Sequence, residues 1–249
     1  MRNTLVYALA TMVAAAIWVA GSGSGAEPAP EAKPSGSEAA VKQAAAANKH
    51  LYIFFFSDDD AATQAIRQPF EAAMAKMADV AQWTALKTDA PAEKALVERF
   101  RLQAVAMPWI VVLAPNGAVT MSRLAVTMPE EKLRAAIASP CQQKCLKALQ
   151  EKKIVVLCAY AKNVGADDPS VKAVNEFKAG AYATITEVVR VDPSDASETR
   201  FLKQLNVDPK RDLTTIVVFP PQNLVGTFLG PVTKDKLEAA IGQFLEACG

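Results

Sequence analysis

Thiol groups are the side chains of this chain with the widest chemical range. The 249-residue sequence holds four cysteines, all in its second half: Cys141, Cys145, Cys158 and Cys248. Thiolates attack disulfides and bind soft metal ions, so these residues are candidates for redox, metal-binding or structural roles. The first half, which contains no cysteine, cannot form a mixed disulfide.

The C-x3-C pair is predicted to lie at the start of a helix. Ser139 is a typical N-cap residue, Pro140 suits the first helical position, and Gln142 completes an S-x-x-Q capping box. Cys141 then falls in the first turn, where the helix dipole favours its thiolate, and Cys145 follows one turn later.

The spacing leaves the role of these thiols open. Cβ atoms at i and i+4 of a helix are about 5–6 Å apart, whereas a disulfide needs about 3.5–4.5 Å. A Cys141–Cys145 bridge would therefore distort the helix, and a bridge from either residue to Cys158, near the end of the next strand, is the expected alternative. A reactive thiol relay, copper or zinc binding by the C-x3-C pair, and inert thiols remain open. Cys248, at the far end of the last helix, could link two chains in a homodimer.

The remaining polar candidates point to no cofactor. Asp60 is an expected helix N-cap, and the spacing of Asp58, Asp59 and Asp60 matches no EF-hand loop, so we predict no metal site. His50 is the only histidine, stands at the start of a strand, and is expected at the surface. Hydrolysis by a nucleophile–histidine pair is therefore disfavoured. No glycine-rich phosphate loop is present outside residues 21–25.

Apolar runs and turn residues predict the elements that position these groups. An alanine-rich helix ends near Asn48, and the strand Leu51–Phe56 follows. The order then continues as helix, strand, helix, two strands joined by an Asn-Gly hairpin, and a closing helix. The predicted ranges are Ala61–Gln82, Trp83–Thr88, Ala92–Phe100, Trp109–Leu113, Ala118–Leu124 and Pro129–Ile137.

This first segment resembles thioredoxin with its two active-site cysteines replaced. Ala61 and Gln64 take the two cysteine positions after the buried strand, and Pro69 takes the place of the proline eight residues after the first cysteine. Met107-Pro108-Trp109, followed by a strand and Asn116-Gly117, resembles the cis-proline segment of the family. The resemblance implies a cis bond at Pro108. It also implies a groove for an extended polypeptide formed by Met107, Pro108, Trp109, Ala61 and Gln64.

The second half repeats the pattern with less similarity. Ile110–Leu113 before Pro115 matches Ile216–Phe219 before Pro221, and this alignment places Thr214 at the cis-proline position. We therefore predict an α/β chain of two thioredoxin-like domains, each a mixed central sheet flanked by helices. The expected boundaries are 41–138 for the cysteine-free domain and 139–249 for the divergent domain with four cysteines.

The N-terminus and the composition set the expected location. Arg2, the apolar run Leu5–Ala20 and Ser24-Gly25-Ala26 predict a cleavable signal peptide over residues 1–26, with an uncleaved anchor as the alternative. Residues 27–40, rich in Pro, Ala, Ser and Glu, predict a flexible linker. We therefore expect a periplasmic or secreted protein with no membrane span in the mature chain.

The charge balance narrows the partners. There are 27 basic and 26 acidic residues with no basic block, so nucleic acid is not an expected partner. The resemblance implies binding of other polypeptides of the envelope or extracellular space, without catalysis in the first domain. The alternatives are a thiol–disulfide oxidoreductase that uses Cys141, Cys145 and Cys158, and a copper or zinc thiolate carrier.

Overall fold

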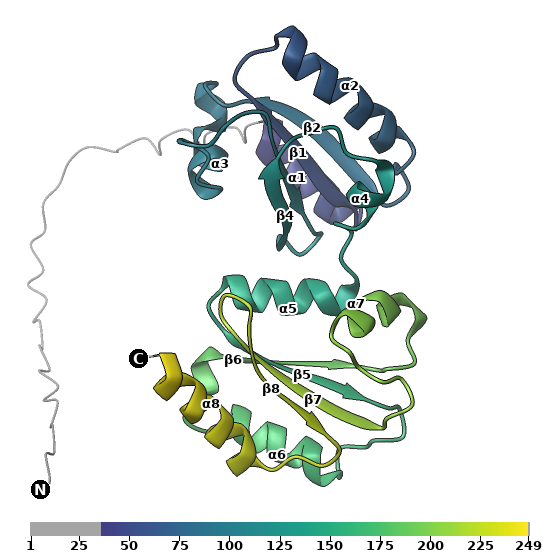
Figure 1. The fold of residues 1–249 in the computed structure, drawn as a ribbon, viewed down its shortest axis with the longest axis vertical. Helices are drawn as coiled ribbons and strands as arrows, with labels where there is room; N and C mark the ends of the chain where they lie inside the picture. Colours follow the sequence, from purple (N-terminus) through teal and green to yellow (C-terminus); the bar gives the residue numbers. More distant parts are fainter. Residues whose placement is uncertain (1–35, 249) are drawn as a thin grey trace, which may run out of the picture. The chain divides into compact units, whose positions relative to one another are not determined.

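The computed structural model describes residues 36–248 (Figure 1), in which two four-stranded sheets follow one another along the chain. The predicted signal peptide and most of the predicted linker lie outside these residues. The elements of the first half are α1 (Gly36–Ala46), β1 (His50–Phe56), α2 (Ala61–Ala75), β2 (Ala81–Lys87), η1 (Pro91–Glu93), α3 (Lys94–Arg99), β3 (Trp109–Leu113), β4 (Val119–Leu124) and α4 (Glu130–Arg134). Those of the second half are α5 (Pro140–Gln150), β5 (Ile154–Tyr160), α6 (Pro169–Lys178), η2 (Ala183–Ile185), β6 (Thr186–Val191), η3 (Ala196–Glu198), α7 (Thr199–Gln204), β7 (Leu213–Phe219), β8 (Asn223–Leu229) and α8 (Lys234–Cys248).

Both sheets have the same topology. The first is ordered β2-β1-β3-β4 and the second β6-β5-β7-β8. In each sheet, the two strands that a helix separates are parallel, the third strand is antiparallel to the central strand, and the last strand is antiparallel to the third. This order of elements, with the Met107–Pro108 bond in the cis form, confirms the predicted pair of thioredoxin-like domains.

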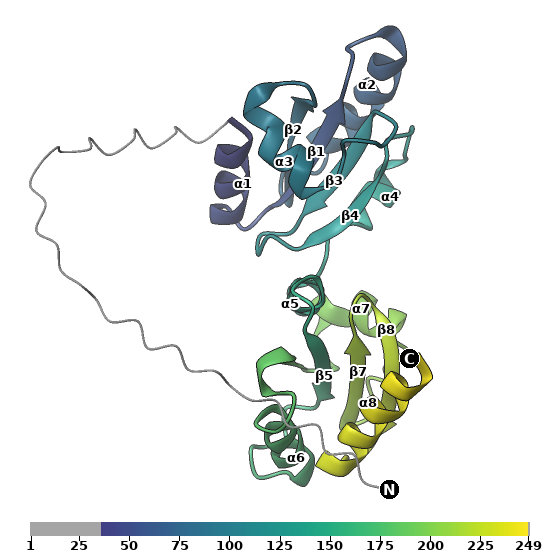
Figure 2. The same cartoon turned by 90° about the vertical axis from the view of Figure 1, so that its left-hand side faces the viewer.

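Helices cover both faces of the first sheet (Figure 2). β1 alternates sides, so Tyr52 and Phe54 pack against α2 and α4, whereas Ile53 and Phe55 pack against α1 and α3. All four side chains are fully buried, which explains why β1 reads as an uninterrupted apolar run. The central strand is therefore fixed from both sides, and its C-terminal end positions the turn before α2.

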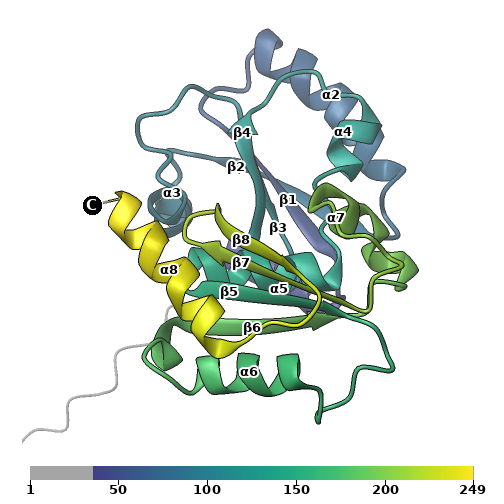
Figure 3. The same ribbon diagram turned by 60° about the horizontal axis from the view of Figure 1, so that its bottom comes forward.

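The second sheet is covered in the same way (Figure 3). Val155 and Leu157 of β5 pack with α5 and α7, and Val156 and Cys158 pack with α6 and α8. The turn between β7 and β8 differs from its counterpart. The first domain uses Asn116-Gly117, where Gly117 has a φ of 80°, and the second has a cis bond between Pro220 and Pro221.

The bulges of the two sheets fix how the copies align. Each antiparallel hairpin shifts register at one point, between Val112 and Leu113 in the first sheet and between Val217 and Val218 in the second. Matching these points places Leu213 level with Pro108 and Thr214 level with Trp109. The predicted equivalence of Thr214 with Pro108 is therefore wrong by one residue, because the apolar stretch alone does not locate the bulge.

The N-terminal boundary also differs from the prediction. α1 begins at Gly36, within the segment expected to be linker, and Ser37 is already buried at 1% exposure. Ala44 of this helix packs in the same core cluster as Ile53 and Phe55 of β1, which anchors the helix to the sheet. Within the described residues, no helix is both long and apolar enough to cross a membrane.

Candidate functional site

The turn that carries the active cysteines in thioredoxins is here closed by polar contacts. Asp60 is the N-cap of α2, as predicted, and its Oδ1 accepts a hydrogen bond of 2.8 Å from the Thr63 N–H. That bond is the main cause of the lowered pKa of Asp60. Gln64, at the second cysteine position, donates from Nε2 to Asp59, and Ala61 is exposed. This turn offers no thiol.

Met107, the residue before Pro108, has an unpaired backbone. Pairing of β3 with β1 begins at Trp109, opposite Phe55. Among residues 36–248, neither the N–H nor the C=O of Met107 has a hydrogen-bond partner. Its side chain is half-buried and borders a cavity of about 410 Å³. The edge beside the cis proline is therefore free to accept a further backbone.

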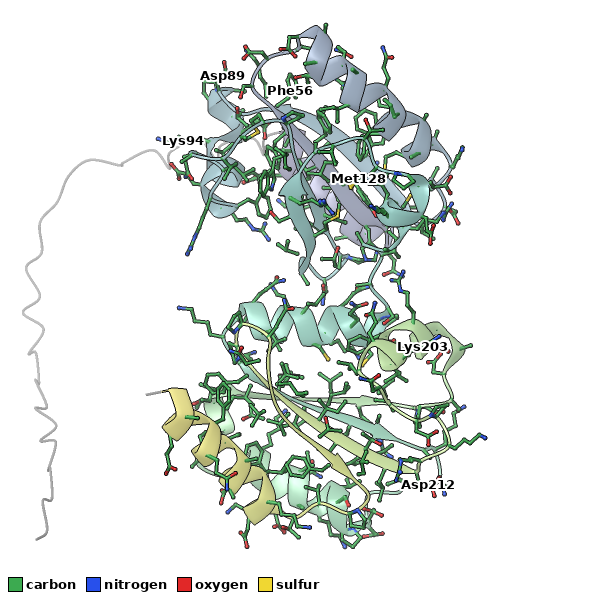
Figure 4. The ribbon with its side chains drawn as sticks, in the orientation of Figure 1. Phe56, Asp89, Lys94, Met128, Lys203 and Asp212 are labelled. Carbon is green, nitrogen blue, oxygen red and sulfur yellow. The ribbon has the colours of Figure 1, made fainter. Side chains whose placement is uncertain are left out.

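This cavity has an apolar floor and a charged rim. Its lining includes the apolar residues Met107, Val105 and Leu102 and the charged residues Asp89, Lys94 and Glu98. Figure 4 shows Asp89 and Lys94 beside α3. Of the five residues predicted to form a groove, Met107 alone lines the cavity. Pro108 is buried, and Ala61 and Gln64 lie on α2 outside it.

Trp109, predicted to line the groove, packs against the core and the neighbouring strand β4. Its indole packs against the α1 and α3 side of the core, and Nε1 donates a hydrogen bond of 2.9 Å to Ser122 Oγ on β4. The ring therefore covers the face of the sheet instead of lining the cavity at Met107.

The C-x3-C pair lies at the start of α5, as predicted, but its thiols are buried and form no disulfide. Cys141 and Cys145 are 5% and 6% exposed, and neither forms a disulfide. A hydrogen bond to the Cys145 thiol, together with burial, raises the pKa of Cys141 above its ordinary value. The prediction that the helix dipole favours a thiolate at Cys141 is therefore wrong, because burial and the neighbouring Cys145 thiol outweigh the effect of the dipole.

Cys158 is not brought together with the other two thiols. It belongs to the core between the second sheet and α6 and α8, whereas Cys141 and Cys145 belong to the core on the opposite face. The expected bridge from either residue to Cys158 is therefore wrong, because the sheet lies between them. Burial raises the pKa of Cys158 to about 11. Cys248 is the last residue of α8.

A buried carboxylate that sequence reasoning missed holds the start of α5. Glu198 is 3% exposed, and its Oε1 accepts a 2.7 Å hydrogen bond from the Cys141 N–H. Its Oε2 accepts from the Ser139 hydroxyl. The Ser139 side chain therefore does not cap α5 as the predicted capping box requires. The carboxylate of Glu198, distant in the sequence, caps the helix instead. Glu93, at the matching place before α3, is also buried.

His50 is buried, so its predicted surface position is wrong. It is 4% exposed, and its Nε2 accepts a 3.1 Å hydrogen bond from the Ala138 N–H. This acceptor requires the neutral ring. Burial lowers the pKa of His50 to about 4.

The pKa of His50 predicts a loss of stability in mild acid. The unfolded state takes up a proton near pH 6.5 and the folded state only near pH 4. The contribution is therefore complete above pH 6.5 and is lost as the pH falls towards 4, by on the order of 2 kcal/mol. Urea unfolding at several pH values would measure it. His50→Gln, which keeps an acceptor and does not titrate, should remove this step; an unchanged pH profile would contradict the assignment.

Metal ligands do not cluster in the part of the chain that the structure describes. Within residues 36–248, no group of three or more His, Cys, Asp or Glu side chains is arranged to hold a metal ion. The carboxylate of Glu198 does not complete a metal site with Cys141 and Cys145, and its oxygens accept hydrogen bonds from the Ser139 hydroxyl and the Cys141 N–H.

Comparison with known proteins adds the following. No protein-family model matches the chain, and no curated protein matches it. Among solved structures, it is similar to the germline-specific thioredoxin Deadhead of Drosophila melanogaster, at 19% identity over 41% of this chain and 90% of that one, with a TM-score of 0.32. It is also similar to the first two thioredoxin domains of Saccharomyces cerevisiae Eps1p, at 12% identity over 86% and 98%, with a TM-score of 0.31. A third similar structure is human ERp44, at 10% identity over 84% and 55%, with a TM-score of 0.34.

Proposed function

We propose that this chain is an exported, tandem thioredoxin-like protein whose first domain binds an extended segment of another polypeptide without thiol chemistry. The observation that carries the proposal is the backbone of Met107, whose N–H and C=O are unpaired beside a cavity of about 410 Å³. An unpaired backbone at a strand end is a site where an added strand gains main-chain hydrogen bonds.

The cavity beside Met107 suits one side chain of such a segment. Val105 and Leu102 offer apolar contact, while Asp89, Glu98 and Lys94 add two negative charges and one positive charge to the lining. Backbone bonds to Met107 would give affinity that is independent of sequence, and the apolar floor would select the side chain placed next to it. The bound class is therefore an extended polypeptide with an apolar residue at one position.

Catalysis by thiols has less support. The turn at Ala61–Gln64 has no cysteine, and raised pKa values keep Cys141 and Cys158 protonated at neutral pH. A protonated thiol does not attack a disulfide. The oxidoreductase alternative therefore has less support than polypeptide binding, and the metal-carrier alternative lacks a third ligand among the described residues.

Amide exchange at Met107 tests the proposal directly. In the free protein its N–H should exchange quickly, because it has no partner. On addition of reduced, carboxymethylated α-lactalbumin, an unfolded polypeptide, we expect exchange at Met107 to slow by at least tenfold, as measured by NMR. Unchanged exchange at saturating polypeptide would rule out pairing at this edge.

A charge placed in the cavity wall should abolish capture. Val105→Asp is expected to weaken binding of the same polypeptide by at least tenfold, because a carboxylate would be buried against the apolar residue of the ligand. Val126→Asp is the matched control, since Val126 is 42% exposed and does not line the cavity. Equal binding by the two variants, measured by calorimetry, would contradict the proposed cavity.

The exported location is tested separately. N-terminal sequencing of the protein recovered from the cell envelope should give Glu27 as the first residue. An intact N-terminus at Met1 would favour the anchored alternative.

A further inference from the structure

The second domain contains a pocket that the proposed binding of polypeptide at Met107 does not use; Cys145 is among its lining residues. The pocket has a volume of about 320 Å³, at the lower end of the range for small-molecule sites. It lies between α5, α7 and one face of β5, β7 and β8, the arrangement that Figure 1 shows for the second sheet. Its lining includes Leu146, Leu149, Leu157, Phe201 and Ile216.

The matching place in the first domain is filled by an indole. Trp109 reaches across the sheet and donates from Nε1 to Ser122 Oγ. By the register of the two hairpins, Trp109 corresponds to Thr214 and Ser122 to Thr227. Thr227 lines the pocket, and the short side chain of Thr214 cannot reach it.

Two further aromatic residues are missing from this face. Phe55 and Phe100, whose rings lie 6.1 Å apart in the first domain, correspond to Ala159 and Leu205 by strand register and by their place at the end of the short helix. By the same comparison Leu96 corresponds to Phe201, so the face that carries the pocket lacks three aromatic side chains of the first domain and gains one.

The polar groups around the pocket define what could fill it. No charged side chain is among the described residues that line it, so a charged ligand would lack a counter-charge. Thr227 offers a hydroxyl where Ser122 accepts the indole N–H in the first domain. Gln142 also lines the pocket, and its Oε1 is buried without a hydrogen-bond partner. Each can accept a hydrogen bond from a ligand, and the other polar side chains of the lining, Gln204, Asn206 and Gln222, belong to exposed residues.

We propose that the second domain binds a small, neutral aromatic molecule with one N–H or O–H donor in this pocket. The ligand takes the place that the Trp109 indole occupies in the first domain. The proposal is independent of polypeptide binding at Met107, because no residue is shared between the two cavities.

Indole is the probe that tests the proposal, and 1-methylindole, which has no donor, is its partner. Calorimetry on the purified protein should show one site for indole and binding of 1-methylindole that is about five- to tenfold weaker. Absence of measurable indole binding would overturn the proposal. Binding of N-acetyltryptophanamide as tight as that of indole would also overturn it, because the site would then take a tryptophan side chain of a polypeptide.

Three variants locate the site. Thr227→Val should weaken indole about fivefold and leave 1-methylindole unchanged, because only the hydroxyl acceptor is lost. Ser122→Ala, the same loss at the filled position of the first domain, should leave indole binding unchanged. Thr214→Trp should fill the pocket and abolish binding of both probes. Thr227 is exposed, so Thr227→Val is expected to fold, and it tests the location of the site even if Thr214→Trp does not fold. Identical indole binding in wild type and Thr227→Val would refute the pocket assignment.

Discussion

Replacing Phe54 by alanine is expected to lower the free energy of unfolding of the first domain by about 3–5 kcal/mol. Phe54 is fully buried at the centre of β1, and its ring lies 5.5 Å from that of Phe70 on α2. Removal of the ring leaves a cavity between strand and helix that neither can close without losing its own packing. Urea unfolding followed by tryptophan fluorescence measures the loss, because Trp83, whose ring lies 5.6 Å from Phe70, reports on this core.

Phe54→Leu serves as the volume control and should cost about 1.5 kcal/mol or less. In the protein without residues 1–26, which include Trp18, the fluorescence signal belongs to the first domain, since Trp83 and Trp109 are the remaining tryptophans. An alanine variant that loses less than the leucine variant would show that Phe54 does not hold α2 to the sheet.

Replacing Glu198 by alanine is expected to lower stability by about 2–3 kcal/mol. The change leaves the Cys141 N–H and the Ser139 hydroxyl without their acceptor at the start of α5. A negative charge at a helix N-terminus is also favourable, and that contribution is lost as well. Exchange of the Cys141 amide should accelerate more than that of amides in the middle of α5.

Glu198→Gln keeps one acceptor without the charge and should lose less stability than the alanine variant. Glu176→Ala, an exposed glutamate on α6, is the control for loss of a carboxylate and should change stability by less than about 0.5 kcal/mol. Equal losses for Glu198→Ala and Glu176→Ala would contradict the capping role.

The fold could be predicted where local pattern and register agree. β3 spans the predicted Trp109–Leu113, the bond before Pro108 is cis, and Asn116-Gly117 forms the hairpin turn. The side of the sheet that each thiol faces could not be predicted. Every residue of β5 is buried, so alternation of apolar and polar residues gives no sign of which face α5 covers.

Long-range partners account for the missed site residues. His50 meets Ala138 across 88 residues, and Glu198 meets Cys141 across 57. Nothing in the sequence near either residue indicates such a contact. The replacement of Trp109 by Thr214 indicates the pocket, but the sequence alignment pairs Thr214 with Pro108 and therefore does not reveal this replacement. The bulge that corrects this alignment is visible only in the pairing of the strands.

The left-handed residues have a consequence for building new proteins from this one. Asn48 and Lys152 precede the central strands, and Arg101 and Asn206 follow the short helices, all four with φ between 54° and 62°. Because both copies bend the backbone at the same places, a segment cut at these residues in one domain has ends that suit the other. Exchange of the segment between such points would transfer Phe55 and Phe100, or Ala159 and Leu205, together, while Trp109 or Thr214 stays in place, so hybrids of the two domains provide a series for varying the pocket.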